Sequence, residues 1–284
     1  MSYIVVTGGA GFIGTNICRK LVDIGESVIS IDDYSSGKRT NHILHDNIKY
    51  IDADTTFIET LSTRPKIVYH LGEYSKVVPS FKDINKIIQT NIYATAKVIE
   101  YCKCFNIKLV YAGSSTRYAV DGANGSPYAF SKAKNAELIK NYGKWYGLKY
   151  AICYFYNNYG PYHDSCGDGW QTVISIFEKQ KKSGVPLTIV SPGTQKRAFT
   201  YVKDTVNGLI AAAAREESDE YQLSSNESYN MFELAELFDH NYELIPERHG
   251  DRIESTIDVS STYDKLNWSP KYSLKEWINK INKG

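Results

Sequence analysis

The feature that most constrains this chain is a glycine-rich turn directly after its first predicted strand. Residues 3–7 form a continuous apolar run, typical of a strand that is buried on both faces. Gly8, Gly11 and Gly14 follow, and a helix is predicted over 12–24. Glycine permits a tight turn and close backbone approach, while the N–H groups at a helix N-terminus bind a pyrophosphate. The turn therefore predicts a bound dinucleotide.

Short β-rich runs alternate with helical stretches along the first half of the chain. Strands are predicted over 3–7, 27–31, 48–52, 67–71, 108–112 and 149–154, and helices over 12–24, 85–105 and 130–146. Short links between them predict right-handed crossovers and a parallel, doubly wound sheet. The expected fold class is α/β. It has a Rossmann-type domain over 1–164, rejoined by about 194–221, and a smaller C-terminal α/β substrate lobe formed by 165–193 and 222–284.

An acidic pair ends the second predicted strand. Asp32 lies at the distance from the turn where an acid accepts the adenosine ribose hydroxyls, and its charge repels the extra phosphate of NADP. NAD is therefore the expected cofactor, although Lys38 and Arg39 lie close enough to leave NADP open. The cofactor-binding residues predicted from this part of the chain are Gly8, Gly11, Phe12, Ile13, Gly14, Asp32 and Asp33. A glycine-rich turn without a ligand is the alternative interpretation.

The bulk composition excludes several other classes of protein. The net charge is +1 and no long charged run occurs, so strong attraction to nucleic acid or to an anionic membrane is not expected. The first strand leaves no room for a signal peptide before it, and no apolar stretch is long enough to cross a bilayer. We expect a cytoplasmic protein with reduced thiols and no metal site, because the cysteines lack CxxC spacing. They are Cys18, Cys102, Cys104, Cys153 and Cys166.

Tyr128 and Lys132 are the predicted catalytic pair. They are one helical turn apart, so the ammonium can lie beside the phenol. A phenol with its ordinary pKa of about 10 is a poor base near neutrality, but a lysine and a positive nicotinamide ring favour the phenolate. Among 23 tyrosines this spacing alone could be coincidence. Ser114 strengthens the prediction, because it follows the strand 108–112 at the end where parallel sheets place ligands; a turn-forming serine is the alternative.

With these motifs the chain resembles extended short-chain dehydrogenases/reductases, in the NAD-dependent sugar epimerase/dehydratase family. The resemblance spans essentially the whole chain. It implies that Asp54 contacts the adenine and that the loop containing Leu71 lies beside the cofactor. It also implies that Asn91 orders the region near the nicotinamide ribose, and that Lys132 holds the ribose hydroxyls in addition to assisting Tyr128.

The resemblance extends to the substrate side. Asn157, in the run Tyr-Asn-Asn-Tyr-Gly-Pro, matches the family asparagine that touches a nucleotide diphosphate. Arg197 and Arg248 resemble two arginines that grip the same diphosphate, and guanidinium forks suit phosphate oxygens. Outside this motif order, either arginine would be interpreted as a surface ion-pair partner.

The residues after Ser114 separate the members of this family. The sugar 4,6-dehydratases have an acidic pair there and the decarboxylases have a glutamate, whereas this chain has Ser115 and Thr116. Elimination needs a further acid and base. The two hydroxyl residues instead resemble the UDP-glucose 4-epimerases, which implies an isomerase that uses Tyr128, Ser114 and bound NAD to oxidise C4 transiently. All three hydroxyl residues are predicted to bind the substrate.

Three departures from the family pattern remain. Glu73 and Tyr74 stand where relatives usually have small or apolar residues, and two roles are open for Glu73: contact with substrate, or capping of the next helix. Ala198 replaces the usual acid after Arg197, and the loop 118–126 is unusually short.

Two alternative functions remain open for this chain, and one oligomeric state is expected. An NAD(P)-dependent 4-keto-sugar reductase, or another dehydratase-family enzyme, is the main alternative, and a non-catalytic dinucleotide sensor is the second. The helices 85–105 and 130–146 are apolar on more than one face. Related enzymes pair two such helices across a dimer axis, so a homodimer is expected, with internal packing as the other explanation.

Overall fold

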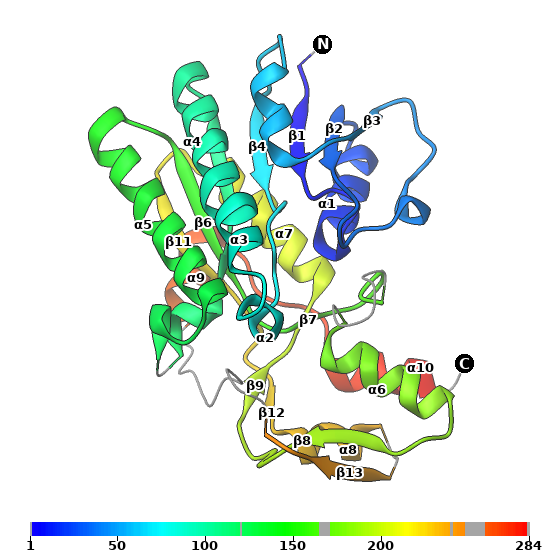
Figure 1. Cartoon of the computed structure of the whole chain (residues 1–284). Helices are drawn as coiled ribbons and strands as arrows, with labels where there is room; N and C mark the ends of the chain where they lie inside the picture. The colour runs from blue at the N-terminus through cyan, green and yellow to red at the C-terminus, as the bar shows by residue number, and fades with distance from the viewer. Residues whose placement is uncertain (1, 120, 165–170, 239–240, 248–258, 283–284) are drawn as a thin grey trace.

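A parallel β-sheet of seven strands forms the centre of the molecule (Figure 1). The computed structural model describes residues 2–119, 121–164, 171–238, 241–247 and 259–282. The strand order is β11-β6-β5-β4-β1-β2-β3, and every neighbouring pair is parallel. Their bounds are Ile4–Thr7 (β1), Val28–Asp32 (β2), Ile48–Asp52 (β3), Ile67–His70 (β4), Lys108–Ser114 (β5), Tyr150–Phe155 (β6) and Asp219–Leu223 (β11). This order is the predicted Rossmann-type doubly wound sheet, which is confirmed.

Helices cover both faces of the sheet, because the strand side chains alternate between two apolar cores. Ile4 and Val6 belong to the core under α1 (Phe12–Asp23) and α7 (Val202–Ala214). Val5 lies in the opposite core with side chains of two further helices. These helices are α4 (Ala94–Phe105) and α5 (Pro127–Tyr146), and they lie side by side in Figure 1. The order of the strands reverses between β1 and β4, which is where such sheets bind ligands.

The helix predicted over 85–105 is interrupted in the structure. It consists of α3 (Ile84–Ile87), a π-helical segment η3 (Ile88–Tyr93) and then α4. Asn91 explains the interruption, because its side chain accepts a bond from Tyr74 N (2.8 Å) and donates to Tyr74 O (3.0 Å). Its backbone carbonyl accepts a further bond from the Asn135 side chain at 2.8 Å. The apolar spacing predicted the helix correctly but could not reveal this local widening, which is common at functional sites.

The start of α5 lies three residues before its predicted position. Ser126 is the N-cap, its Oγ accepts a bond from Ala129 N at 3.0 Å, and Pro127 occupies the first helical position. A capping serine followed by proline is a helix-start signal that the sequence carried. As a result Tyr128 lies in the first turn of α5.

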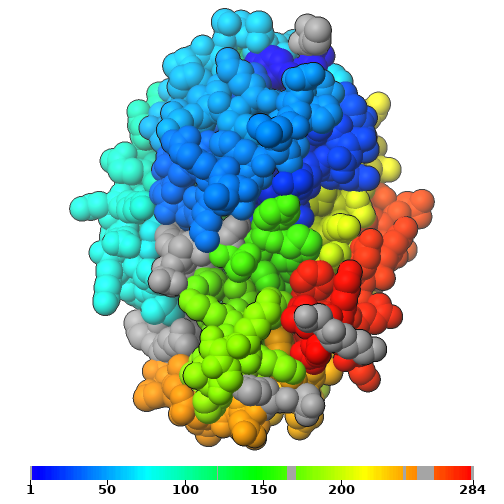
Figure 2. All heavy atoms as spheres, turned by 90° about the vertical axis from the view of Figure 1, so that its right-hand side faces the viewer, coloured from blue at the N-terminus to red at the C-terminus, as the bar shows by residue number. Residues whose placement is uncertain are grey.

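A second set of elements lies beyond the C-terminal edge of the sheet and has its own apolar core. Figure 2 shows these green, orange and red segments beneath the blue N-terminal part. The elements are α6 (Val173–Lys182), β8 (Leu187–Val190), β9 (Arg197–Ala198), β12 (Ser228–Tyr229), α8 (Met231–Leu237), β13 (Tyr242–Ile245) and α10 (Leu274–Asn282). Two elements that follow residue 194 return to the sheet: α7 packs on it and β11 extends its edge.

Short elements connect these parts. They are β7 (Asn158–Tyr159), β10 (Thr200–Tyr201), α2 (Val77–Ser80), α9 (Ser260–Leu266) and the 3-10 turns η1 (Arg39–Asn41), η2 (Thr55–Thr60), η4 (Ser115–Tyr118) and η5 (Gly122–Asn124). α9 packs against α7 and β11. Within the described ranges, no helix is both long and apolar enough to span a membrane.

Candidate active site

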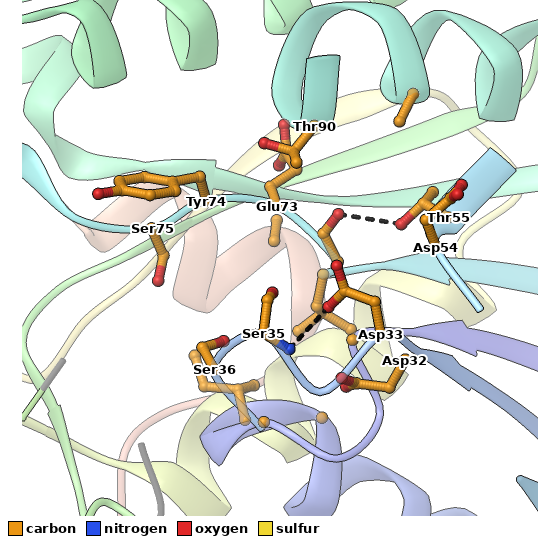
Figure 3. Close-up of a pocket in the computed structure, with 18 of the residues that line it drawn as sticks. Asp32, Asp33, Ser35, Ser36, Asp54, Thr55, Glu73, Tyr74, Ser75 and Thr90 are labelled. Carbon is orange, nitrogen blue, oxygen red and sulfur yellow. Dashed lines mark hydrogen bonds between the residues drawn. The ribbon is translucent and has the colours of Figure 1, made fainter. Parts of the chain in front are cut away.

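A pocket of about 590 Å³ lies along the C-terminal ends of β1, β2, β4 and β5. Its volume falls within the usual range for small-molecule sites. All the residues predicted to bind the cofactor line it, except Asn91; they are Gly8, Gly11, Phe12, Ile13, Gly14, Asp32, Asp33, Asp54, Leu71, Tyr128 and Lys132. Figure 3 shows Asp32, Asp33, Asp54 and Glu73 around this pocket, with Tyr74 and Ser75 on the opposite side from Asp54. Segments far apart in sequence thus form one elongated site.

Gly8 and Gly14 of the turn are required by close packing of backbone on backbone. Gly8 has φ +70°, and a Cβ there would lie 2.8 Å from the Cα of Gly72 in the loop after β4. A Cβ on Gly14 would lie 1.9 Å from the Gly8 carbonyl oxygen. Gly11 is the N-cap of α1 and offers no side chain to its first turn. The helix N-terminus is therefore bare and faces the pocket, which fits a pyrophosphate.

Asp32 is fixed at the end of β2 by two backbone donors. Its carboxylate accepts Ala10 N and Tyr34 N, each at 2.8 Å. Burial raises the pKa of this carboxyl, while these N–H groups oppose the shift. Asp33 accepts Ser35 N at 2.9 Å (Figure 3). The remaining oxygen lone pairs at this edge can accept ribose hydroxyls.

Tyr128 and Lys132 lie on one face of α5, and both are buried with access to the pocket. The Tyr128 ring packs in a small apolar cluster with Tyr74 and Ile87. The Lys132 ammonium lies 4.5 Å from the centre of the Tyr111 ring and donates to the Ala112 carbonyl. Burial lowers the pKa of Lys132, and a neighbouring acid opposes that shift.

That acid is Glu73. Its carboxylate forms a buried ion pair with the Lys132 ammonium. The expectation that Glu73 caps the next helix is wrong, because α2 has Lys76 at its N-cap position and no side-chain cap. The loop after β4 turns the Glu73 side chain toward α5 instead, where the buried lysine supplies the opposite charge. Contact between Glu73 and a substrate stays a prediction.

Ser114 is the last residue of β5, and its hydroxyl is oriented by the turn that follows. Its Oγ accepts bonds from Thr116 N (3.3 Å) and Thr116 Oγ1 (3.0 Å). Accepting from both leaves the Ser114 hydrogen to be donated elsewhere. Ser114 therefore caps η4 as a turn-forming serine would, and it can also donate to a ligand. Ser115 is buried beside it.

Two of the predicted diphosphate contacts, Asn157 and Arg197, lie near each other and apart from the cofactor residues. Asn157 donates from Nδ2 to the Ala198 carbonyl at 2.8 Å, which places it beside Arg197 on β9. Ala198 is buried and pairs with Ser228 across two short strands. The predicted substrate-binding residues that lie in the described part of the chain, including Arg197, do not line the pocket formed by the cofactor-binding residues. Arg248 and Cys166 lie outside the described residues.

Several pocket residues were missed by the sequence reasoning. The loop after β2 adds Ser35 and Ser36, and η2 adds Thr55. Others come from the loop after β4 (Tyr74, Ser75, Lys76), from α3 (Lys86), from η3 (Gln89, Thr90, Tyr93), from the end of β6 (Phe155), from β7 (Asn158) and from the N-cap of α6 (Thr172). The serines could have been found, since they follow the acidic pair in the same loop. The residues of η3 could not, because the π-helical segment determines which of its side chains face the pocket.

The chain is similar to proteins of known family. The sequence pattern of the NAD dependent epimerase/dehydratase family matches residues 4–231. UDP-glucuronic acid decarboxylase 1 of Arabidopsis thaliana is 28% identical over 300 residues, which is 98% of this chain and 68% of that protein.

Solved structures give the same family. The UDP-glucose 4-epimerase of Thermotoga maritima, solved with UDP-glucose, is 27% identical with a TM-score of 0.90, covering 99% of this chain and 97% of that one. The UDP-N-acetylglucosamine 4-epimerase of Methanobrevibacter ruminantium, solved with UDP-N-acetylmuramic acid, is 29% identical with a TM-score of 0.91 and the same coverage. The pattern match extends from the glycine turn through α5 to the first residue of α8. The chain therefore belongs to the NAD-dependent epimerase/dehydratase family.

Proposed function

We propose that this protein is an NAD-dependent nucleotide-sugar 4-epimerase that acts on a UDP-hexose. The observation that carries the proposal is the set of three consecutive hydroxyl residues that begins at the last residue of β5. Ser114, Ser115 and Thr116 place hydroxyl groups, and no carboxyl group, where elimination or decarboxylation would need an acid or base. Tyr128 and Lys132 are present on α5, so the site keeps the groups that transfer a proton to or from an alcohol. Such a site can oxidise and reduce one carbon without removing a group.

The residues have the following roles in this proposal. NAD, when bound, would accept a hydride from C4 of the sugar and return it to the other face. Tyr128 takes the proton of the C4 hydroxyl at its Oη and later gives it back. The Lys132 ammonium favours the ionised phenol and holds the ribose hydroxyls of the dinucleotide. Ser114 donates a hydrogen bond to the oxygen at C4 while that oxygen gains carbonyl character.

Asn157, Arg197 and Arg248 are proposed to hold the diphosphate. Bidentate guanidinium contacts would fix the nucleotide while the sugar turns over between the two hydride transfers. The contact between Asn157 and the backbone beside Arg197 supports a shared site for the first two. By the domain boundaries expected from the sequence, Arg248 belongs to the substrate lobe, whereas Asn157 and Arg197 fall in the segments 1–164 and 194–221, so the diphosphate would lie between the two parts.

The first prediction concerns turnover without an added reductant. Purified protein should carry NAD and interconvert UDP-glucose with UDP-galactose, or their N-acetyl forms, because the hydride is returned in each cycle. Proton NMR of the sugar anomeric signals measures the interconversion, and acid release followed by chromatography measures the bound NAD. UDP-glucuronic acid is included as a further substrate. A need for stoichiometric NADPH, or release of carbon dioxide from the uronic acid, would contradict the 4-epimerase assignment.

The second prediction concerns assembly, since we also propose a homodimer that pairs α4 and α5 with their copies. Phe105, Phe130, Trp145 and Tyr146 on these helices expose 44%, 49%, 60% and 57% of their surface. Large exposed apolar groups on adjacent helices are typical of an interface. Sedimentation velocity should give twice the 32.1 kDa chain mass. Trp145→Glu should shift the protein toward the monomer, while a monomeric wild type would exclude the dimer.

A further inference from the structure

Glu73 is a buried acid that has no role in the proposed reaction. Only 2% of its side chain is exposed, and its ion-pair partner Lys132 is 6% exposed. It lines the same pocket as Tyr128 (Figure 3). A charge without a partner at such a position would be strongly unfavourable. The ion pair therefore explains how the acid is tolerated, and its surroundings indicate what it does.

The Glu73 carboxylate is saturated with hydrogen-bond donors. Its Oε1 accepts Thr95 Oγ1 (3.1 Å), Tyr111 Oη (3.0 Å) and Asn135 Nδ2 (2.9 Å). Its Oε2 accepts the Lys132 ammonium. Four donors from α4, β5 and α5 hold the carboxylate in one orientation. The carboxylate is thereby tied to three elements of the fold around Lys132.

The polar contacts continue away from the pocket through neutral groups. Thr95 gives its hydrogen to Glu73, so it must accept from His70 Nε2 at 2.8 Å. His70 Nδ1 then accepts from Thr7 Oγ1 at 2.7 Å. Burial lowers the pKa of His70 to about 4, which keeps the imidazole neutral near pH 7. The charge that balances Glu73 is thus the Lys132 ammonium.

We propose that Glu73 is a positioning residue for Lys132, which it orients and keeps charged although the lysine side chain is buried. An ammonium has three N–H donors. Lys132 gives one to Glu73 and one to the Ala112 carbonyl. One donor is left for a ligand, and its direction is set by the other two. The inference rests on the proposed function in one respect, namely that Lys132 serves a bound dinucleotide and Tyr128.

The charge of Glu73 also sets the pH range over which Tyr128 and Lys132 can act together. A fixed negative charge raises the pKa of each titratable neighbour. Those neighbours are His70 from β4, Tyr111 from β5 and Lys132 from α5. Thr95 from α4 does not titrate, and Tyr128 lines the same pocket as Glu73. Turnover needs Tyr128 deprotonated and Lys132 protonated. Removing the negative charge lowers both pKa values, so both limbs of the pH profile should move to lower pH.

The test is Glu73→Gln, which keeps the shape of the side chain and removes its charge. We expect the midpoints of both limbs to fall by about one pH unit or more. The dissociation constant of NAD, measured by titration calorimetry between pH 6 and pH 9.5, should rise at least tenfold on the alkaline side and recover at lower pH. NAD binding needs no sugar, so a wrong substrate or reaction would leave this measurement valid.

Two further variants make the test specific. Glu220→Gln is the matched control, because Glu220 on β11 also pairs with a lysine of α5, Lys140, at 3.2 Å and lies outside the pocket. It should leave both limbs and the NAD affinity unchanged. Glu73→Asp keeps the charge but shortens the side chain. It should therefore weaken NAD binding without moving either limb of the pH profile. This variant serves as the test if Glu73→Gln does not fold. The proposal would be overturned if the Glu73 variants kept both the pH profile of turnover and the NAD affinity of the wild type. It would also be overturned if Glu73→Gln lost turnover while neither limb of its pH profile moved.

Discussion

Tyr128→Phe should lower turnover by about 10²–10⁴-fold, the usual contribution of a positioned acid–base group. The ring packs against Tyr74 and Ile87, and phenylalanine keeps that packing. The fold and the bound NAD should therefore persist, while the proton at C4 loses its acceptor. Two measurements check this: the rate of sugar interconversion by NMR, and the amount of NAD retained after gel filtration.

Tyr142→Phe is the matched control for this change. Tyr142 lies on the same helix, and its hydroxyl bonds to Glu100 at 2.6 Å, on the helix α4 and away from the pocket residues. Removing this hydroxyl should leave turnover within about twofold, since no proton of the reaction passes through it. Full activity in Tyr128→Phe would remove the tyrosine from the mechanism. A loss of NAD together with activity would instead give Tyr128 a role in binding.

The fold could be predicted from the sequence because its signals are local. The apolar run 3–7, the glycine turn and the strand–helix alternation each specify one short piece of backbone, and their order allows few topologies. The predicted strands agree with the observed ones to within about two residues at each end. The π-helical segment could not be predicted, because it depends on Asn91 reaching Tyr74 in the loop before it. Periodicity of apolar residues does not record such a contact.

The candidate site was predicted where a motif fixes the position of a side chain. The glycine turn, Asp32 and the pair Tyr128 and Lys132 are motifs of this kind, and all of them line one pocket. Glu73 is different. Its identity marks it as unusual, but its four donors come from three other elements, up to 62 residues away in sequence. Neither role inferred for it included Lys132, because only the folded sheet brings the loop after β4 against α5.

Gly14→Ala should destabilise the fold and weaken NAD binding, although helix propensity alone favours alanine. Gly14 lies inside α1, where alanine is ordinarily more favourable by about 1 kcal/mol. Here the added Cβ would lie 1.9 Å from the Gly8 oxygen, 2.7 Å from the Gly8 carbonyl carbon and 2.8 Å from the Gly9 Cα. These are backbone atoms, so the turn itself must move. We expect the free energy of unfolding to fall by about 1–3 kcal/mol. A distortion that costs the bound state about 3 kcal/mol would weaken NAD binding about 100-fold.

Gly11→Ala separates the loss of stability from the loss of NAD binding, because Gly11 lines the pocket and has little protein around it. Its φ of −76° suits alanine, and the nearest atom to an added Cβ is the Gly8 oxygen at 3.4 Å. The free energy of unfolding, measured by urea titration of protein stripped of NAD, should therefore change by less than about 1 kcal/mol. NAD affinity should still fall, because the methyl group stands at the helix N-terminus where a pyrophosphate approaches. If Gly11→Ala bound NAD as tightly as the wild type, the pyrophosphate would have to lie elsewhere, and the glycine turn would serve only to pack α1 against β1.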